Sequence, residues 1–208
     1  MTDYVLVGGG AFAREVHDWF APMLAGQGDR FAGYIDDNDQ PMAAYGRDLP
    51  QLGSIDGYRP NPKHRLVMAV ASPKGKQLLA EKLTARGAAF ASLFHPTTSL
   101  SASATVGPGA VVVPYCVISA DVRAGAFATL NGFVSLGHDV ALDDYVTLSG
   151  YVGLMGAVQV GARTFFGAGA RVLPKVKIGA DCTIGAGAIV MRRAPDGATL
   201  YAPPAKRL

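Results

Sequence analysis

The sequence predicts two joined folds, a small α/β domain over residues 1–98 and an all-β parallel β-helix over residues 99–208. Apolar residues recur with a period of six from Leu100 onward, which matches neither a helix nor the alternation of an ordinary strand. Near the N-terminus, a strand, a glycine turn, a helix and a second strand follow one another. Half of the 208 residues are hydrophobic and 26 are glycine, so the apolar surface must be buried in a glycine-rich architecture.

The composition excludes several classes of protein. With 17% charged residues and a mean hydropathy of +0.22, the chain is too apolar to be disordered. No stretch approaches the ~18 uninterrupted apolar residues of a membrane-spanning helix. The first residues, MTDYVLVGGG, contain an acid and no basic region, which does not fit a signal peptide. We therefore expect a cytoplasmic protein without a membrane partner.

The α/β domain is predicted element by element. Its strands are expected over residues 4–7, 31–35, 66–70 and 90–94, and its helices over residues 12–24 and 74–86. The turn Gly8-x-Gly10-x-x-Ala13 follows the first strand and opens the first helix, and Asp36 ends the second strand. This arrangement fits a phosphate or ribose of a sugar nucleotide. NAD(P) binding and a purely structural turn are the alternatives.

The period-six repeat predicts the β-helix. Sixteen consecutive hexads start with an apolar residue, and the residue four positions later is always Ala, Val, Cys or Thr. The sixteen apolar residues are Leu100, Val106, Val112, Ile118, Ala124, Leu130, Leu136, Leu142, Leu148, Leu154, Val160, Phe166, Val172, Ile178, Ile184 and Val190. Seven of the sixteen residues that directly follow them are glycine, which predicts a positive φ at that position of each corner. The pattern resembles the left-handed β-helix acyltransferases, in which three hexads form one triangular coil. That resemblance implies about five coils.

Residues eighteen apart should then stack on successive coils, at a spacing of ~4.8 Å. Cys116 and Cys182 come out three coils apart and cannot form a disulfide. The position three after the apolar residue should point outward. It forms two aromatic columns, one of Tyr115, Phe133 and Tyr151 and one of Phe127 and Tyr145. We expect a homotrimer with one of these columns at the subunit contact. A ligand groove is the alternative.

Segments from most of the chain carry a resemblance to one family. They are VLVGGGAFAREV, AGYIDDN, SLFHPTTSLSASATVGPGAVV, LNGFVSLGHDV and YAPPAKRL. Together they resemble the sialic-acid O-acetyltransferases and bacillosamine N-acetyltransferases. The resemblance implies acetyl-CoA as donor and a nucleotide-linked amino sugar, of the 4-amino-4,6-dideoxyhexose type, as acceptor.

The same resemblance implies roles for particular residues. It gives His138 the catalytic role with Asp139 as its acidic neighbour, and it matches the family's asparagine to Asn131. Sugar-nucleotide contacts fall on Gly8, Gly10, Ala11, Phe12, Ala13, Asp36 and Asp37. The sequence departs from the family's pattern in three places. Alanines stand at positions 11 and 13, where the family often has glycine, Thr147 replaces a second histidine, and Ala71-Ser72-Pro73 replaces a Gly-Asn type turn.

Acetyl transfer needs a base, donors for the oxyanion and a groove for coenzyme A. His138 is the only histidine of the repeat, and imidazole changes its protonation near neutral pH. Gly156 stacks eighteen residues later, so its N–H is our candidate oxyanion donor. Asp139 can orient His138 only if the chain turns a corner there, and Asp121, one coil earlier, is the reserve.

Positive charge collects at the C-terminal coils, where residues 160–208 carry eight Lys or Arg and two Asp or Glu. This excess suits the phosphates of coenzyme A. The candidates are Gly156, Lys175, Arg193, which should stack directly on Lys175, and Lys206 and Arg207 in the tail. A nucleic-acid partner would need a broader basic face, and we expect none.

Three alternatives to an N-acetyltransferase stay open. An O-acetyltransferase for sialic acid or a related sugar could use the same base. A hexapeptide metalloenzyme of the carbonic anhydrase type needs three histidine ligands, and the single His138 argues against it and against any metal. A β-helical protein that binds a sugar nucleotide without catalysis is the third.

Overall fold

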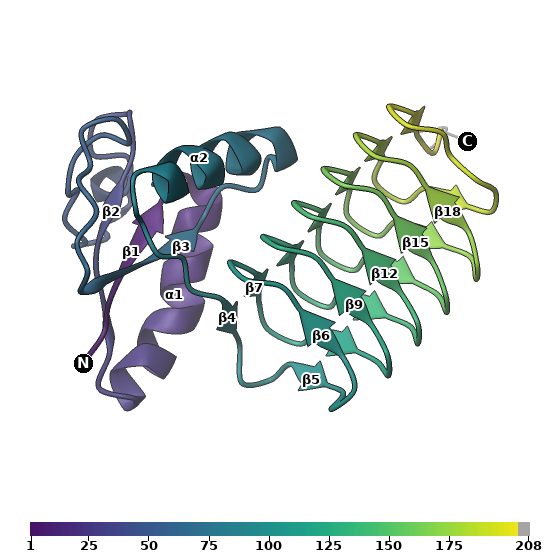
Figure 1. Cartoon of the computed structure of the whole chain (residues 1–208), viewed down its shortest axis with the longest axis horizontal. Helices are drawn as coiled ribbons and strands as arrows, with labels where there is room; N and C mark the ends of the chain where they lie inside the picture. The colour runs from purple at the N-terminus through teal and green to yellow at the C-terminus, as the bar shows by residue number, and fades with distance from the viewer. Residues whose placement is uncertain (204–208) are drawn as a thin grey trace, which may run out of the picture.

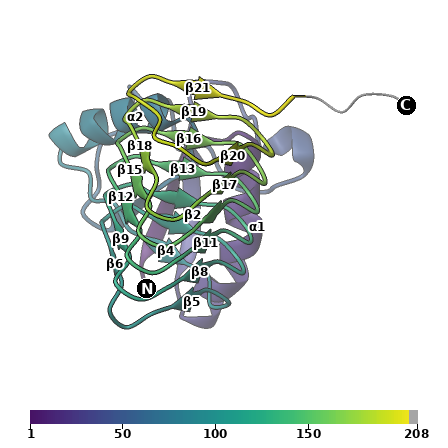
Figure 2. The ribbon, with the colours of Figure 1, turned by 90° about the vertical axis from the view of Figure 1, so that its right-hand side faces the viewer.

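The computed structural model describes residues 1–203, and it confirms the fold of an α/β unit joined to a left-handed parallel β-helix (Figure 1). The coils extend away from the α/β unit, from teal beside it to yellow at the far end. Figure 2 shows them stacked one above another from β5 to β21. Among residues 1–203, no helix is long and apolar enough to cross a membrane.

The α/β unit contains a three-stranded parallel sheet in the order β2-β1-β3. Its elements are β1 (Asp3–Val7), α1 (Ala11–Gly26), β2 (Arg30–Ile35), the 3₁₀ turn η1 (Ala43–Tyr45), β3 (His64–Met68) and α2 (Pro73–Ala85). The chain crosses from one side of β1 to the other between β2 and β3. The carboxyl end of β1 is therefore a topological switch point, which is where open α/β sheets bind ligands.

The strand predicted over residues 90–94 does not join this sheet. Phe90 makes only an isolated bridge to Leu66, whereas β4 (Leu93–Phe94) pairs with β7 (Val111–Val112). The prediction was wrong because a short apolar run can pair with any free strand edge, and here the first full coil of the β-helix provides it. The β-helix thus begins a few residues before position 99.

The β-helix has three parallel sheets, which we name after their first strands. The β4 sheet contains β4, β7, β10 (Thr129–Leu130), β13 (Thr147–Leu148), β16 (Phe165–Phe166), β19 (Thr183–Ile184) and β21 (Thr199–Leu200). The β5 sheet contains β5 (Ser99–Leu100), β8 (Val117–Ile118), β11 (Ser135–Leu136), β14 (Gly153–Leu154), β17 (Arg171–Val172) and β20 (Ile189–Val190). The β6 sheet contains β6 (Thr105–Val106), β9 (Arg123–Ala124), β12 (Ala141–Leu142), β15 (Gln159–Val160) and β18 (Lys177–Ile178). The sheets have seven, six and five strands, more than five coils require, because the sixteen hexads exceed five coils by one strand and β4 and β21 extend the repeat at its two ends.

The interior of the β-helix is built as the repeat predicts. Fourteen of the sixteen large apolar residues are buried, and the exceptions, Leu100 and Val106, belong to the first coil, which has no full coil beneath it. The small position is filled by Ala, Val and Cys, and also by Thr164, whose Oγ1 donates to the Gly179 carbonyl at 2.8 Å. A buried hydroxyl is acceptable there because it is hydrogen-bonded.

The left-handed residue of each corner is not the one that we predicted. Positive φ occurs three positions after the large residue, for example at 60° in Asp139 and 63° in Tyr145. The glycines that directly follow the large residue have a different reason to be glycine. A Cβ on Gly137 would lie 2.8 Å from the Gly156 nitrogen, and one on Gly161 would overlap the Ala180 nitrogen. Close approach of the next coil, and not positive φ, therefore excludes a side chain at these two glycines.

The two aromatic columns have different surroundings. Tyr115, Phe133 and Tyr151 form a ladder of parallel rings with centroids 5.1 and 4.8 Å apart, and all three are exposed. Phe127 and Tyr145 also stack, at 5.4 Å, but Phe90 of the α/β unit packs against Phe127 in an edge-to-face arrangement, with the ring centroids 5.0 Å apart. The second column is therefore a contact within the chain, and only the first, which we call the aromatic ladder, is free for a subunit contact.

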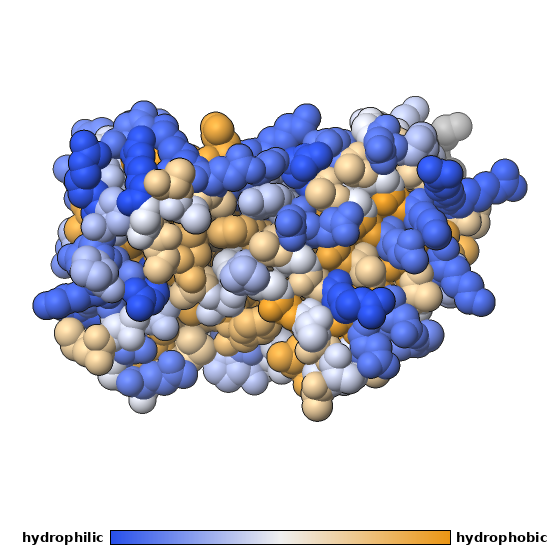
Figure 3. All heavy atoms as spheres, viewed as in Figure 1, coloured by the Kyte–Doolittle hydropathy of each residue, from blue (hydrophilic) through white to orange (hydrophobic). Residues whose placement is uncertain are grey.

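The α/β unit covers the outer surface of the β4 sheet. Val111, Val113, Thr129 and Thr147 point outward from this sheet and are nevertheless buried. Figure 3 shows hydrophilic residues along the upper edge, over α2, and apolar residues across the middle of the same face. In the triangular cross-section, the corner opposite this covered sheet is the one between the β5 and β6 sheets.

Candidate functional site

His138 lies at the corner between the β5 and β6 sheets, in the segment between β11 and β12. Asp139 is the left-handed residue of the corner, and it turns its own side chain outward beside that of His138. The His138 Nδ1 atom is 2.7 Å from Asp139 Oδ2, and the imidazole is 70% exposed. The turn that a contact between Asp139 and His138 requires is present, and the reserve residue Asp121 makes no hydrogen bond or ion pair with the imidazole among the described residues.

The next coil places Gly156 against the other side of the imidazole. A Cβ at this position would overlap Nε2 of His138 and would lie 2.6 Å from its Cε1. The Gly156 carbonyl accepts from the Lys175 N–H at 2.9 Å, whereas no acceptor for the Gly156 N–H is found among residues 1–203. A free donor therefore lies close to the Nε2 atom that faces away from Asp139.

Two grooves run along the sheets that meet at this corner. One, of about 430 Å³, runs along the β5 sheet between the aromatic ladder and Gly156, with Met155 and Arg171 in its wall. The other, of about 420 Å³, runs along the β6 sheet and is lined by Asp143, Gln159, Lys177 and Arg193. The first groove reaches the His138 corner at Gly137 and Gly156, and the second lies further along the β6 sheet.

The basic residues of the last coils are arranged differently from the prediction. Lys175 lies on the same corner as Gly156, one coil further on. Arg193 does not stack on Lys175, because Ala194 pairs with Ile178 and the last coil is two residues shorter than a full turn. Arg193 therefore lies beside Lys177, in the groove of the β6 sheet. Lys206 and Arg207 lie outside the described residues.

The glycine loop follows β1 at the switch point. Gly8 has a φ of 102°, Gly10 is the N-cap of α1, and Ala11, Phe12 and Ala13 form the first helical turn. The Gly9 N–H donates to Asp36 Oδ2 at 2.7 Å, which joins the ends of β1 and β2. A Cβ on Gly9 would lie 2.7 Å from Pro41, so the loop after β2 packs directly on the glycine loop.

The two aspartates after β2 both accept hydrogen bonds from the backbone. Asp36 also accepts from the Asn38 N–H, and Asp37 accepts from the Ile55 N–H at 2.9 Å. Sequence reasoning missed Arg14, whose guanidinium lies 3.4 Å above the ring of Tyr45. The available signal was a basic residue one helical turn after Gly10.

Asn131 is not brought to His138. It lies at the other end of β11, at the corner of the aromatic ladder, and its buried Oδ1 has no hydrogen-bond partner in residues 1–203. Thr147, at the second-histidine position, donates instead to the Ala71 carbonyl at 2.8 Å. No cluster of three or more metal-ligating side chains occurs in the part of the chain that the structure describes.

A left-handed β-helix with one imidazole at a corner, a free backbone N–H beside it and basic coils beyond it defines the class of hexapeptide-repeat acyltransferases. Residues 157–192 match the family described as bacterial transferase hexapeptide (six repeats). A search of curated proteins finds no match.

Solved structures cover nearly the whole chain. PerB from Caulobacter crescentus, solved with CoA and GDP-perosamine, is 31% identical over 99% of this chain and 97% of that one, with a TM-score of 0.86. Related structures from the same organism are named perosamine N-acetyltransferase. The acetyltransferase domain of PglB from Neisseria gonorrhoeae is 25% identical over the full length of both chains, with a TM-score of 0.85. This chain belongs to their family, the bacillosamine-type hexapeptide-repeat acetyltransferases.

Proposed function

We propose that this protein transfers the acetyl group of acetyl-CoA to the amino group of a nucleotide-linked amino sugar of the 4-amino-4,6-dideoxyhexose type. The observation that carries the proposal is the pairing of His138, bound to Asp139, with the free N–H of Gly156 on the next coil. The similarity to enzymes solved with CoA, acetyl-CoA and GDP-perosamine supports the choice of donor and acceptor.

His138 is the general base in this proposal. With its Nδ1–H donated to Asp139, the Nε2 lone pair is available to the acceptor. The amine nitrogen attacks the thioester carbon and passes its proton to Nε2. The C–S bond of the tetrahedral intermediate then breaks, and the imidazolium returns the proton to the departing sulfur.

Gly156 stabilises the intermediate through its N–H. The oxyanion forms on the former thioester oxygen, and a fixed backbone donor there lowers the barrier without reorganisation. The missing side chain lets the thioester approach both this donor and Nε2. The pantetheine arm then follows one of the two grooves, with Arg171, Lys175, Lys177 and Arg193 available to the phosphates.

The acceptor nucleotide binds at the carboxyl end of β1. The uncapped first turn of α1 and Gly10 supply backbone N–H groups for phosphate, and Arg14 adds a cation beside them. Asp36 and Asp37 keep one side of the loop acidic, which suits the ribose or a base with N–H donors. No metal takes part in this proposal.

The enzyme is a homotrimer in this proposal, with sites shared between subunits. The α/β unit lies on the β4 sheet and His138 at the opposite corner, so one chain cannot bring its own nucleotide loop to its own imidazole. Large exposed apolar residues gather along the β5 sheet: the aromatic ladder, Val117, Met155, Ile189 and Met191. A face of this kind on a prism-shaped repeat favours cyclic association. Cytoplasmic location is part of the same proposal, since both cysteines are free thiols.

The test is CoA release with acetyl-CoA and a GDP-, UDP- or dTDP-linked 4-amino-4,6-dideoxyhexose. We expect turnover with one of the three, and an amide in the product by NMR. An ester product would favour the O-acetyltransferase. Nucleotide-sugar binding by thermal shift without any turnover would favour the non-catalytic protein.

A further inference from the structure

Lys76 is the one charged side chain that is fully buried in residues 1–203. It lies on α2 and reaches into the contact between the α/β unit and the β4 sheet. Its Nζ is 2.8 Å from Thr129 Oγ1 and 2.9 Å from the Val146 carbonyl. No carboxylate is within ion-pair distance among the described residues, and burial alone lowers the pKa of this amine well below its usual value. An apolar side chain would avoid this cost of desolvation, so stability alone does not explain a lysine here.

A second buried hydrogen bond crosses the same contact one coil further on. Thr147 pairs with Thr129 on the neighbouring strand, and its Oγ1 donates to the Ala71 carbonyl at 2.8 Å. Ala71 lies between β3 and α2, next to Val70 and Ala69. These two residues touch the glycine loop, since a Cβ on Gly8 would lie 3.0 Å from Val70 Cγ2 and 3.3 Å from the Ala69 carbonyl oxygen. The β-helix is thus linked by directional bonds to the segment that supports the nucleotide loop.

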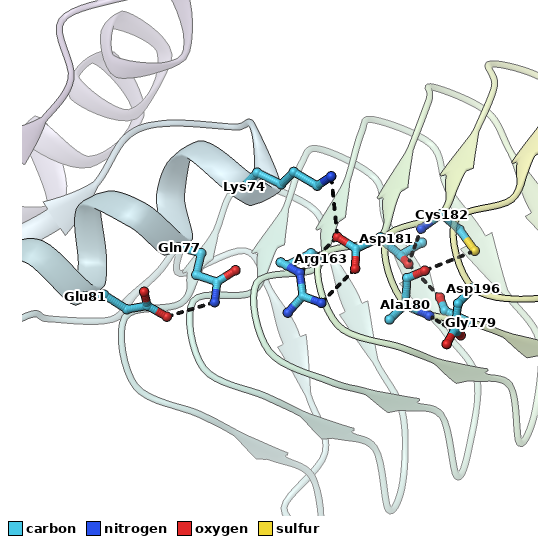
Figure 4. A network of polar contacts seen from close by, with 10 residues as sticks. Lys74, Gln77, Glu81, Arg163, Gly179, Ala180, Asp181, Cys182 and Asp196 are labelled. Atoms are coloured by element: carbon cyan, nitrogen blue, oxygen red, sulfur yellow. Dashed lines mark hydrogen bonds and ion pairs between the residues drawn. The ribbon is translucent and has the colours of Figure 1, made fainter.

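At its outer edge, the same contact is made by exposed charged groups and not by buried hydrogen bonds. There Lys74 of α2 approaches Asp181, which Arg163 binds through two nitrogen atoms (Figure 4). The Lys74 side chain is 79% exposed and its nitrogen is 3.8 Å from Asp181. Such a surface pair fixes little, because water competes for both charges.

We propose that Lys76, together with Thr147, is a positioning residue that holds the nucleotide-binding edge of the α/β unit at a fixed position on the β-helix. This inference rests on the proposed function. The subunits associate through their β-helices, so the position of the nucleotide relative to any His138 depends on how the α/β unit lies on its own β4 sheet. Apolar packing alone permits sliding, whereas buried hydrogen bonds have direction.

Lys76→Met tests this role, because methionine fills similar space without the amine. We expect a kcat at least about tenfold lower for the nucleotide-linked acceptor, since a small misplacement of reactants is costly. The KM for acetyl-CoA and the slow rate with a nucleotide-free 4-amino sugar should stay within about twofold, because neither uses the α/β unit. The Tm should be equal or higher. Lys74→Met is the matched control and should change none of these quantities.

Two results would overturn the positioning role: an unchanged kcat for the nucleotide-linked acceptor, or an equal loss with the nucleotide-free amine. If Lys76→Met does not fold, Thr147→Val removes only the bond to Ala71 and should lower the same kcat with the same selectivity. A wild-type enzyme that acetylates no nucleotide-linked amine would instead contradict the proposed function. The two failures are therefore distinguishable.

Discussion

At the scale of single residues, the proposed mechanism assigns proton transfer to the imidazole of His138. We expect His138→Ala to lower kcat by about 10² to 10⁴, as for the loss of a general base, with little change in the KM for acetyl-CoA. Steady-state kinetics measures both constants. His17→Gln on α1 is the control and should behave as wild type.

A near-normal kcat in His138→Ala would show that His138 is not the general base. The amine would then arrive already neutral and attack unaided, and His138 would only hold the acceptor. Asp139 would lose its catalytic role with it, because its one contact to the site is the bond to Nδ1.

Gly156 allows a second test at this scale. Gly156→Ala would put a methyl group onto Nε2 of His138, and the backbone there is not left-handed, so the fold should be retained. We expect kcat to fall by about 10² or more, the loss typical of a disturbed oxyanion site, with a Tm close to wild type. Gly132→Ala is a matched control, because its new methyl group would meet only the Pro114 carbonyl oxygen, at 3.7 Å. Equal activity of the two alanine variants would contradict the role of Gly156.

At the scale of elements, the corners of the coils show why some glycines are required. Gly161→Ala would force a Cβ into the backbone of the next coil at Ala180, and neither backbone can move without breaking the stacking. We expect a loss of about 1–3 kcal/mol in the free energy of unfolding, as for overpacking in a core. Urea unfolding measures it, with Gly132→Ala again as the control. A loss as small as that of the control would show that the coils can separate locally.

The same elements show how far sequence reasoning reaches. The hexad period predicted which residues fill the β-helix, because every coil repeats one local environment, and it placed Gly156 beside His138 from spacing alone. The period did not predict the shortened last coil, because the small apolar Ala194 fits the interior whether or not that coil is shortened. Arg193 was therefore placed wrongly. Lys76 and the cover over Phe127 depend on how two units dock. No local pattern encodes that docking, although Phe90, which follows α2 in the sequence, was an aromatic residue available for such a contact.

At the scale of the whole molecule, the aromatic ladder and the apolar β5 sheet predict the assembly. The native mass should be about 65 kDa, three copies of the 21.6 kDa chain. Phe133→Glu would place a charge in the middle of the ladder and should shift the mass by light scattering towards that of the monomer. The equivalent change on the covered side, at Tyr145, should instead lower the Tm, because that ring packs within the chain. A wild-type monomer with full activity would refute the trimer.

The opposite placement of the nucleotide loop and His138 makes one further prediction for the assembled enzyme. Asp36→Ala should remove nucleotide binding, and His138→Ala removes the base, so each homotrimer is inactive. If every site combines the loop of one subunit with the imidazole of a neighbour, unfolding and refolding an equal mixture should restore activity. Random assembly gives an intact pair at roughly a quarter of the sites, because each half must come from the complementary variant. If loop and imidazole of the same chain met in one site, every site would lack one of them, and no mixture could recover turnover.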